Sequence, residues 1–136
     1  MKKIRVYYSH AMTGLDQGDR RKMMDRIREF KKLLGSDFDV VVPESWQKEV
    51  TLDTIYHRDV LELRKCSLVF MDSKFLWNVA GRGVYEEVGF AKAAGIPVIE
   101  LLCSTDRHPF SYGSEAVFVS LLDAANYIKE RYNETY

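Results

Sequence analysis

Two neighbouring glutamates, Glu86 and Glu87, follow the glycine-rich segment Gly81-Arg82-Gly83 near the start of a predicted helix. The first N–H groups of a helix lack partners within it, and with the helix dipole they hold an anion or keep a nearby carboxylate ionised. Successive helical residues point about 100° apart, so one glutamate is expected to face a ligand. The glycines are equally consistent with a simple turn, because they lack the dinucleotide-binding and P-loop patterns.

Small residues follow Glu87 along the same helix, and this spacing is expected to let the helix lie close on a sheet. They are Gly89, Ala91, Ala93, Ala94 and Gly95. A glutamate in the first turns of such a helix is placed to act on a ligand. We therefore take Glu87 as the candidate for chemistry and Glu86 as a solvated residue.

A second polar segment follows the first predicted strand. Its candidate substrate-binding residues are Ser9, His10, Met12 and Thr13. Ser9-His10 has no obvious third member for a hydrolase triad. Tyr7 and Tyr8 precede this segment, and because successive strand residues point to opposite faces, only one of these tyrosines can reach the site.

Alternating strands and helices position these residues. Runs of β-branched and aromatic residues predict strands at 4–8, 38–42, 67–71, 96–102 and 116–119. Helical spacing of apolar residues predicts a helix that ends at Gly35 and turns Met23, Ile27, Phe30 and Leu34 inward. Further helices are predicted over 51–65, 84–94 and 120–132. The inward residues of the last are Leu121, Leu122, Ala125 and Ile128.

This alternation predicts a single α/β domain over residues 1–136. The expected fold is a doubly wound, five-stranded parallel sheet of order 2-1-3-4-5, Rossmann- or flavodoxin-like, with helices on both faces. Its switch point lies between the first and third strands, and ligands bind there at the carboxyl ends of the strands. The residues after Tyr8 and Met71 are therefore the expected binding site.

The composition and charge argue against several classes of protein. Twenty basic residues balance twenty acidic ones, so nothing steers the chain toward nucleic acid or an anionic membrane. Cys66 and Cys103 form no metal-binding pattern and are expected to be reduced, buried thiols of a cytoplasmic protein. No apolar run predicts a signal peptide or a membrane span. We expect neither a metal nor a cofactor.

Three blocks of the sequence together resemble one family. Gly83-Val84-Tyr85-Glu86-Glu87-Val88-Gly89-Phe90-Ala91, followed by Gly95-Ile96-Pro97-Val98, resembles the G-x-x-x-E-x-G-x-A … G-x-P-V pattern of the nucleoside 2-deoxyribosyltransferase superfamily. That superfamily includes the 2'-deoxynucleoside 5'-monophosphate N-glycosidases. The opening segment 3–14 is similar to the family's first strand and loop, and 58–69 to its segment with a conserved aspartate.

The resemblance implies specific roles. Glu87 matches the nucleophilic glutamate, Tyr7 the tyrosine that positions it, and Asp59 the aspartate that protonates the leaving base. Gly83 matches a glycine of the family's sugar-binding loop, and Gly81 stands where the transferases have an aspartate and the nucleotide hydrolases a serine. Ser111 falls at the spacing from Glu87 at which some hydrolases supply a serine to the neighbouring subunit's site. Arg82, Thr13 and Ser9 are expected to meet a 5'-phosphate, and Asn78 or Asp72 a sugar hydroxyl. The resemblance also implies a homodimer or a higher homo-oligomer.

This chemistry requires opposite protonation states of the two acids. Asp59 must carry a proton, so its half-apolar helix face is expected to raise its pKa, whereas Glu87 is expected to stay ionised near its helix start. Water and a second base are both possible acceptors, which leaves hydrolase and transferase open. The hydrophobic loop 73–80, with Phe75, Leu76 and Trp77, is predicted to be either a lid or base platform, or else a dimer contact or a surface cover.

Two other functions fit the same fold. One is an NAD-cleaving or ADP-ribose-forming enzyme, which also uses a catalytic glutamate in a flavodoxin-like setting. The other is a non-catalytic nucleotide-binding module. The presence of Tyr7, Asp59 and Glu87 together argues against a module, because binding alone needs no nucleophile.

Overall fold

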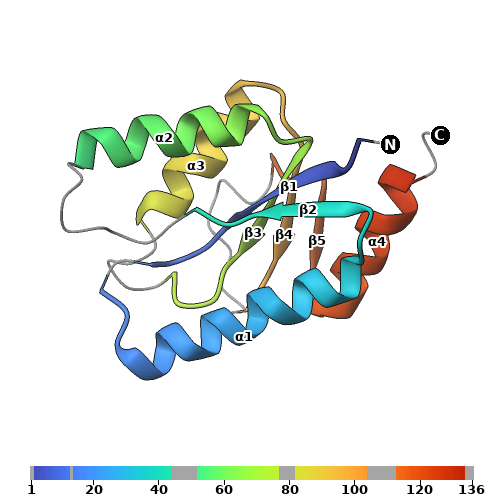
Figure 1. The fold of residues 1–136 in the computed structure, drawn as a ribbon, viewed down its shortest axis with the longest axis horizontal. Coiled ribbons are helices and arrows are strands. Elements are labelled where there is room, and N and C mark those ends of the chain that lie inside the picture. The colour runs from blue at the N-terminus through green and yellow to red at the C-terminus, as the bar shows by residue number, and fades with distance from the viewer. Residues whose placement is uncertain (1, 13, 44–51, 77–81, 104–112, 134–136) are drawn as a thin grey trace.

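The computed structural model describes residues 2–12, 14–43, 52–76, 82–103 and 113–133, with only the backbone for 52–57, 82 and 133. Strands and helices alternate along these residues (Figure 1). The strands are β1 (Ile4–Ser9), β2 (Phe38–Val41), β3 (Leu68–Asp72), β4 (Val98–Leu101) and β5 (Ala116–Phe118). The helices are α1 (Gln17–Leu34), α2 (Leu52–Arg64), α3 (Arg82–Ala93) and α4 (Leu121–Asn133).

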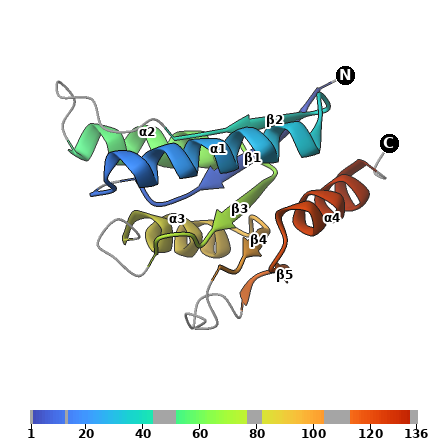
Figure 2. The ribbon, with the colours of Figure 1, turned by 90° about the horizontal axis from the view of Figure 1, so that it is seen from below.

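The strands form one parallel sheet in the order β2-β1-β3-β4-β5. Figure 2 shows them following one another from β2 at one edge to β5 at the other. Helices α1 and α4 cover one face of this sheet, and α2 and α3 cover the other (Figure 1). The predicted doubly wound α/β fold and its strand order are thus confirmed.

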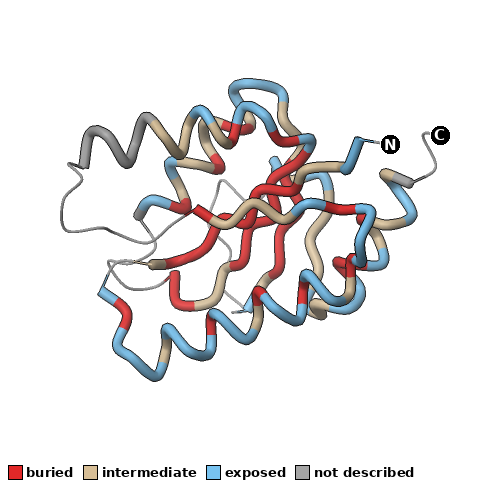
Figure 3. Tube along the Cα trace, in the orientation of Figure 1, coloured by how far each residue is buried: buried red, intermediate tan, exposed pale blue. Residues whose placement is uncertain are grey.

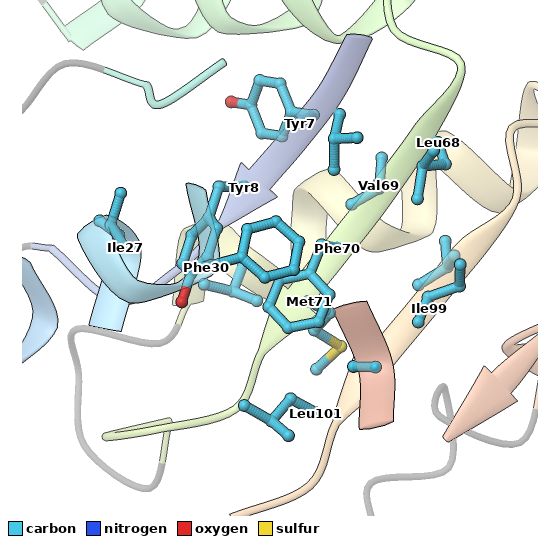
Figure 4. Close-up of a cluster of buried hydrophobic side chains, with 14 of the residues drawn as sticks. Tyr7, Tyr8, Ile27, Phe30, Leu68, Val69, Phe70, Met71, Ile99 and Leu101 are labelled. Carbon is cyan, nitrogen blue, oxygen red and sulfur yellow. The ribbon is translucent and has the colours of Figure 1, made fainter. Parts of the chain in front are cut away.

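The core lies on both sides of β3, all of whose residues are buried (Figure 3). On the α1 side, Phe30 stacks on Phe70 with ring centroids 4.2 Å apart, and Tyr8 packs edge-on against Phe30 at 5.3 Å (Figure 4). Burial of each such ring stabilises the fold by about 1.5–3 kcal/mol. The predicted inward stripe of α1 is the buried one, and the helix ends at Gly35, whose φ of 84° suits glycine.

The inward face of α4 differs from the prediction at one position. Leu122 is 51% exposed, whereas Ala124, Ala125 and Ile128 are fully buried. The helix begins at Leu121, after Ser120, whose hydroxyl accepts a hydrogen bond from the N–H of Asp123. Its buried residues therefore follow the spacing of one helical face, and Leu122 points away from that face.

The small residues of α3 also differ from the prediction. Ala91 is fully buried, but Ala93 and Ala94 are exposed. A Cβ atom added at Gly89 would have no described atom within 4 Å. Close packing of α3 on the sheet therefore depends on Ala91 and not on the other small residues.

The described helices include none that is both long enough and apolar enough to span a membrane.

Candidate active site

The carboxyl ends of β1 and β3 lie side by side, because Ser9 pairs with Met71 in parallel register. The chain leaves β1 toward α1 on one face of the sheet and leaves β3 toward α3 on the other. This divergence is the switch point at which doubly wound folds bind ligands. Glu87 of α3 and Asp59 of α2 both belong to the face covered by α2 and α3.

The carboxylate of Glu87 receives two hydrogen bonds from β1. The hydroxyl of Tyr7 donates to Oε2, and the hydroxyl of Ser9 donates to Oε1 at 2.8 Å. Tyr7 and Ser9 are both fully buried, while Glu87 remains partly exposed. Since the two donors are alternate residues of one strand, they project from the same face of β1.

Burial raises the pKa of Glu87 to about 7, although the hydrogen bonds from Tyr7 and Ser9 oppose the shift. The charges of Asp59 and Glu86 raise it further. The sequence predicts instead that the start of the helix keeps Glu87 ionised. However, α3 begins at Arg82, two residues earlier than predicted, so its first turn contains no acidic residue. The helix dipole acts mainly on the first turn, and it cannot offset the burial of Glu87.

Asp59 lies on α2 with its side chain 13% exposed, and its Oδ1 is 3.7 Å from Nε of Arg58. Burial raises the pKa of Asp59, the charge of Glu62 adds to this, and Arg58 opposes it. The charge of Asp59 in turn raises the pKa of both Tyr7 and Glu87, so Asp59 lies within electrostatic range of both groups. The expected direction of the Asp59 shift is therefore present.

The opposite face of the sheet holds a third carboxylate, that of Asp72, whose place there the sequence did not indicate. Asp72 is fully buried at the end of β3 and accepts a hydrogen bond of 2.6 Å from the hydroxyl of Tyr8. Nε and Nη2 of Arg26 each donate to Asp72 at 2.8 Å, from α1. Asp72 was a candidate for contacting a sugar hydroxyl, but it faces α1 and its oxygens are occupied by these donors.

The pairing of Arg26 with Asp72 was not predicted, because the apolar stripe of the helix identifies only its fully buried residues. Arg26 lies next to Ile27 at the border of that stripe, and its side chain is 25% exposed. An arginine at such a border, together with an aspartate that ends an apolar strand, is the available signal for a buried ion pair.

His10 packs against the residues of the α1 face. Its Nδ1 lies 3.1 Å from the carbonyl oxygen of Tyr8, and its ring meets that of Tyr8 edge-on at 5.6 Å. Burial lowers the pKa of His10 below that of an exposed histidine. These contacts hold His10 beside Tyr8, and the hydrogen bonds of Glu87 come instead from Tyr7 and Ser9.

The remaining predicted binding residues have varied positions. Met12 is partly exposed in the loop after β1, and Gly83 is exposed in the first turn of α3. Arg82 is the first residue of α3, and its side chain lies outside the described part of the chain. Four further candidates also lie outside the described residues: Thr13, Asn78, Gly81 and Ser111.

The first part of the loop 73–80 belongs to the core. Phe75 and Leu76 are only 5% and 8% exposed, and Phe75 has a φ of 68°, which is unusual for an aromatic residue. These two side chains are therefore buried within the chain and are not a free surface for a base or a second subunit. Trp77, the third member of this predicted surface, lies outside the described residues.

Among the residues described, no three His, Cys, Asp or Glu side chains are grouped so that they could hold a metal ion. Cys66 is buried as expected, but Cys103 is exposed, and its Sγ lies 3.2 Å from Nη2 of Arg26.

Comparison with known proteins finds similarity in structure alone. No protein-family model matches the sequence, and no curated protein matches it. A conserved protein from Enterococcus faecalis V583 superposes with a TM-score of 0.75 at 17% identity, over 95% of this chain and 99% of that one. A 2-deoxyribosyltransferase from Bacillus psychrosaccharolyticus superposes with a TM-score of 0.71 at 15% identity, over 90% of this chain and 91% of that one. At these identities the similarity establishes the fold, which this chain shares with a 2-deoxyribosyltransferase.

Proposed function

We propose that this protein breaks or exchanges the N-glycosidic bond of a nucleoside or nucleotide, with Glu87 as nucleophile and Asp59 as acid. The observation that carries the proposal is the pair of hydroxyl donors on Glu87, one on each carboxylate oxygen. Donors of this kind stabilise a carboxylate in its charged form, as a nucleophile requires. The shared fold with a 2-deoxyribosyltransferase supports the same class of reaction.

In the first step, an oxygen of Glu87 attacks C1' of the sugar as the C1'–N bond breaks. The electron pair of that bond goes to the departing nitrogen, and Asp59 supplies its proton. In the second step, water or the nitrogen of a second base attacks C1' from the vacated side and releases Glu87. Asp59 takes the proton of the incoming group, so both acids return to their starting states. Two displacements retain the configuration at C1'.

The two acids must hold a single proton between them, and it must reside on Asp59. Burial raises the pKa of each, and the charge of Asp59 raises that of Glu87 further, so the protonation of the two acids is coupled. The hydroxyls of Tyr7 and Ser9 favour the form in which Glu87 is ionised and the proton is on Asp59. In that form the nucleophile and the acid are both ready, and the pKa of about 7 means that ionised Glu87 becomes available as the pH rises through neutrality.

The substrate in this proposal is a small molecule. The equal numbers of acidic and basic residues offer no general attraction for a nucleic-acid polymer. A 5'-phosphate on the substrate would have to be met by local groups, and Ser9 has its only hydroxyl proton directed at Glu87. Arg82, which belongs to the first turn of α3, remains a candidate for that role.

The test is a panel of ribonucleosides, deoxyribonucleosides, their 5'-monophosphates and NAD, each incubated with and without a second free base. Free base released without an acceptor indicates a hydrolase, whereas a new nucleoside formed only with an acceptor indicates a transferase. Acid-quenched wild-type enzyme should carry the sugar as an ester on the peptide that contains Glu87. Glu87→Ala should lose both turnover and ester, and Glu86→Ala, which alters the exposed neighbour, should keep both.

Turnover that survives Glu87→Ala would refute the nucleophile. Turnover of NAD alone would replace the nucleoside substrate with an ADP-ribose donor. No turnover of any panel member would leave a nucleotide-binding module as the better description.

Ser111 offers a test of the proposed homodimer. If one subunit supplies Ser111 to the other's site, then an inactive Glu87→Gln subunit mixed with an impaired Ser111→Ala subunit should form one intact site per heterodimer. Activity should then rise on mixing, after the two variants have exchanged subunits. A mixture that shows only the sum of its separate activities would contradict a shared site.

A further inference from the structure

Ser9 and Tyr7 hold Glu87 in a way that follows from strand geometry. They are two residues apart in β1, so both point to the α3 face, and Tyr8 between them points to α1. Figure 4 shows Tyr7 and Tyr8 leaving β1 in opposite directions. One strand thereby places two hydroxyl donors at the spacing of the two oxygens of one carboxylate.

Ser9 has little freedom for any other task. It is fully buried, it ends β1 beside Met71 of β3, and its hydroxyl donates to Oε1 of Glu87 at 2.8 Å. A serine hydroxyl donates one hydrogen bond only. The hydrogen bond to Glu87 therefore competes with the substrate-binding role that the sequence suggested for Ser9.

We propose that Ser9 is a positioning residue for Glu87. Together with Tyr7, Ser9 fixes the plane in which the Glu87 carboxylate meets the sugar. Each oxygen is held by one donor and keeps a second lone pair for attack on C1'. A carboxylate held at both oxygens cannot rotate about its last side-chain bond without losing both hydrogen bonds. The contact of Glu87 with a sugar rests on the proposed function, whereas the restraint of the Glu87 carboxylate by Ser9 and Tyr7 does not.

The surroundings of Glu87 explain why a second donor matters. Tyr7 and Ser9 approach it from β1, Asp59 approaches from α2, and Glu86 is its neighbour on α3. The two acids and the burial all disfavour the charged form, and the two hydroxyls favour it. Without Ser9, the hydroxyl of Tyr7 alone would oppose burial and the charges of Asp59 and Glu86, all of which raise the pKa of Glu87.

The direct test is the titration of Glu87 itself, followed by ¹³C NMR of the glutamate carboxyl carbons and assigned with Glu87→Gln. In Ser9→Ala, the midpoint of Glu87 should move upward by about one pH unit, as expected for loss of one hydrogen bond to a charged group. Ser73→Ala is the matched control. It removes a hydroxyl at the end of the neighbouring strand, where Ser73 donates to the carbonyl of Leu101, and it should leave the midpoint unchanged.

The kinetic test uses kcat/KM against pH. Ser9→Ala should shift the acid limb upward by about the same one unit, so that the loss is roughly tenfold at pH 6 and small at pH 9. Ser9→Thr keeps a hydroxyl, so the acid limb of its kcat/KM profile should lie close to that of the wild type.

Each outcome separates the two proposals. An unchanged Glu87 midpoint in Ser9→Ala, or an equal loss of kcat/KM at every pH, would overturn the positioning role. A shifted midpoint in a protein without glycosidic turnover would overturn the proposed function and leave the restraint on Glu87 standing.

Discussion

Tyr7 and Tyr8 are consecutive residues of β1, and their hydroxyl groups reach carboxylates on opposite faces of the sheet. Tyr7 donates to Glu87 on the α3 side, and Tyr8 donates to Asp72 on the α1 side. Glu87 is partly exposed, and burial shifts its pKa toward neutrality. Asp72 is fully buried and ion-paired with Arg26. The same side-chain chemistry therefore serves a candidate site on one face and the stability of the fold on the other.

This relationship predicts different effects for two equal substitutions. Tyr7→Phe should lower kcat/KM about tenfold or more near pH 7, because Glu87 loses a donor and its pKa rises further. Tyr8→Phe should leave the pH profile unchanged and lower the free energy of unfolding by about 1–2 kcal/mol, because Asp72 loses a buried donor. Urea unfolding and pH–rate profiles of both variants check this. The interpretation fails if Tyr8→Phe shifts the acid limb as much as Tyr7→Phe does.

Glu87→Gln should remove activity and stabilise the protein at alkaline pH. The pKa of Glu87 is about 7 in the folded state against 4.5 for an ordinary glutamate. The folded state therefore binds the proton more tightly, and stability is full below pH 4.5 and decreases as the pH rises through 7. Glutamine carries no charge and avoids this loss. We expect the Tm at pH 8 to rise by roughly 5 °C, with little change at pH 4.5.

Thermal unfolding followed by circular dichroism at both pH values measures this effect. Glu86→Gln is the control, because it makes the same chemical change at the exposed neighbouring position. An equal gain at both pH values, or an equal gain in the control, would show that the charge of Glu87 is not the cause.

Asp59→Asn tests the acid. With natural bases, kcat/KM should fall about 10²–10⁴-fold, because the departing nitrogen no longer receives a proton. With a strongly electron-poor base that leaves as a stable anion, the fall should be much smaller. Because Asp59 is the proposed acid, the alkaline limb of the wild-type profile should also disappear in this variant. Equal losses for both kinds of leaving group would instead indicate a role in binding.

Gly89→Ala tests whether α3 packs closely at Gly89, as the small residues of the sequence suggested, or has open space there, as in the structure. Close helix packing at Gly89 would make an added methyl group destabilising. The structure leaves open space there among its described residues, so alanine should stabilise α3 by about 0.5–1 kcal/mol through its higher helix propensity. Urea unfolding measures the difference, and a clear loss of stability would show that a surface outside the described residues covers Gly89.

The fold was predictable from the sequence because its strands and helices alternate and each carries the apolar pattern of its type. Met23 to Leu34 of α1 illustrate this, since local spacing alone identifies their buried face. The contact of Tyr7 with Glu87 follows from the family resemblance. The ion pair of Arg26 with Asp72 could not be predicted in either way. It joins a helix to a strand, and the spacing of residues in the sequence does not show that these two side chains meet.

The protonation state of Glu87 was the harder quantity to predict. It depends on burial by several elements and on the residue at which α3 begins, and helix ends are poorly defined by sequence. A shift of two residues in that start moves Glu87 out of the first turn. The family resemblance therefore predicted that Tyr7 and Glu87 meet, and the three-dimensional structure was needed to judge how strongly each acid holds its proton.

Glu87 is 80 positions from Tyr7 and 78 from Ser9 along the chain, so no local segment can form this hydrogen-bonded group. During synthesis, the donors in β1 emerge long before the acceptor, and they can meet only when α3 docks on the sheet. In a refolding experiment, the return of the pKa of Glu87 to about 7 would then mark long-range assembly and not the formation of individual helices. The candidate nucleophile is thus also a built-in reporter of when the tertiary structure is complete.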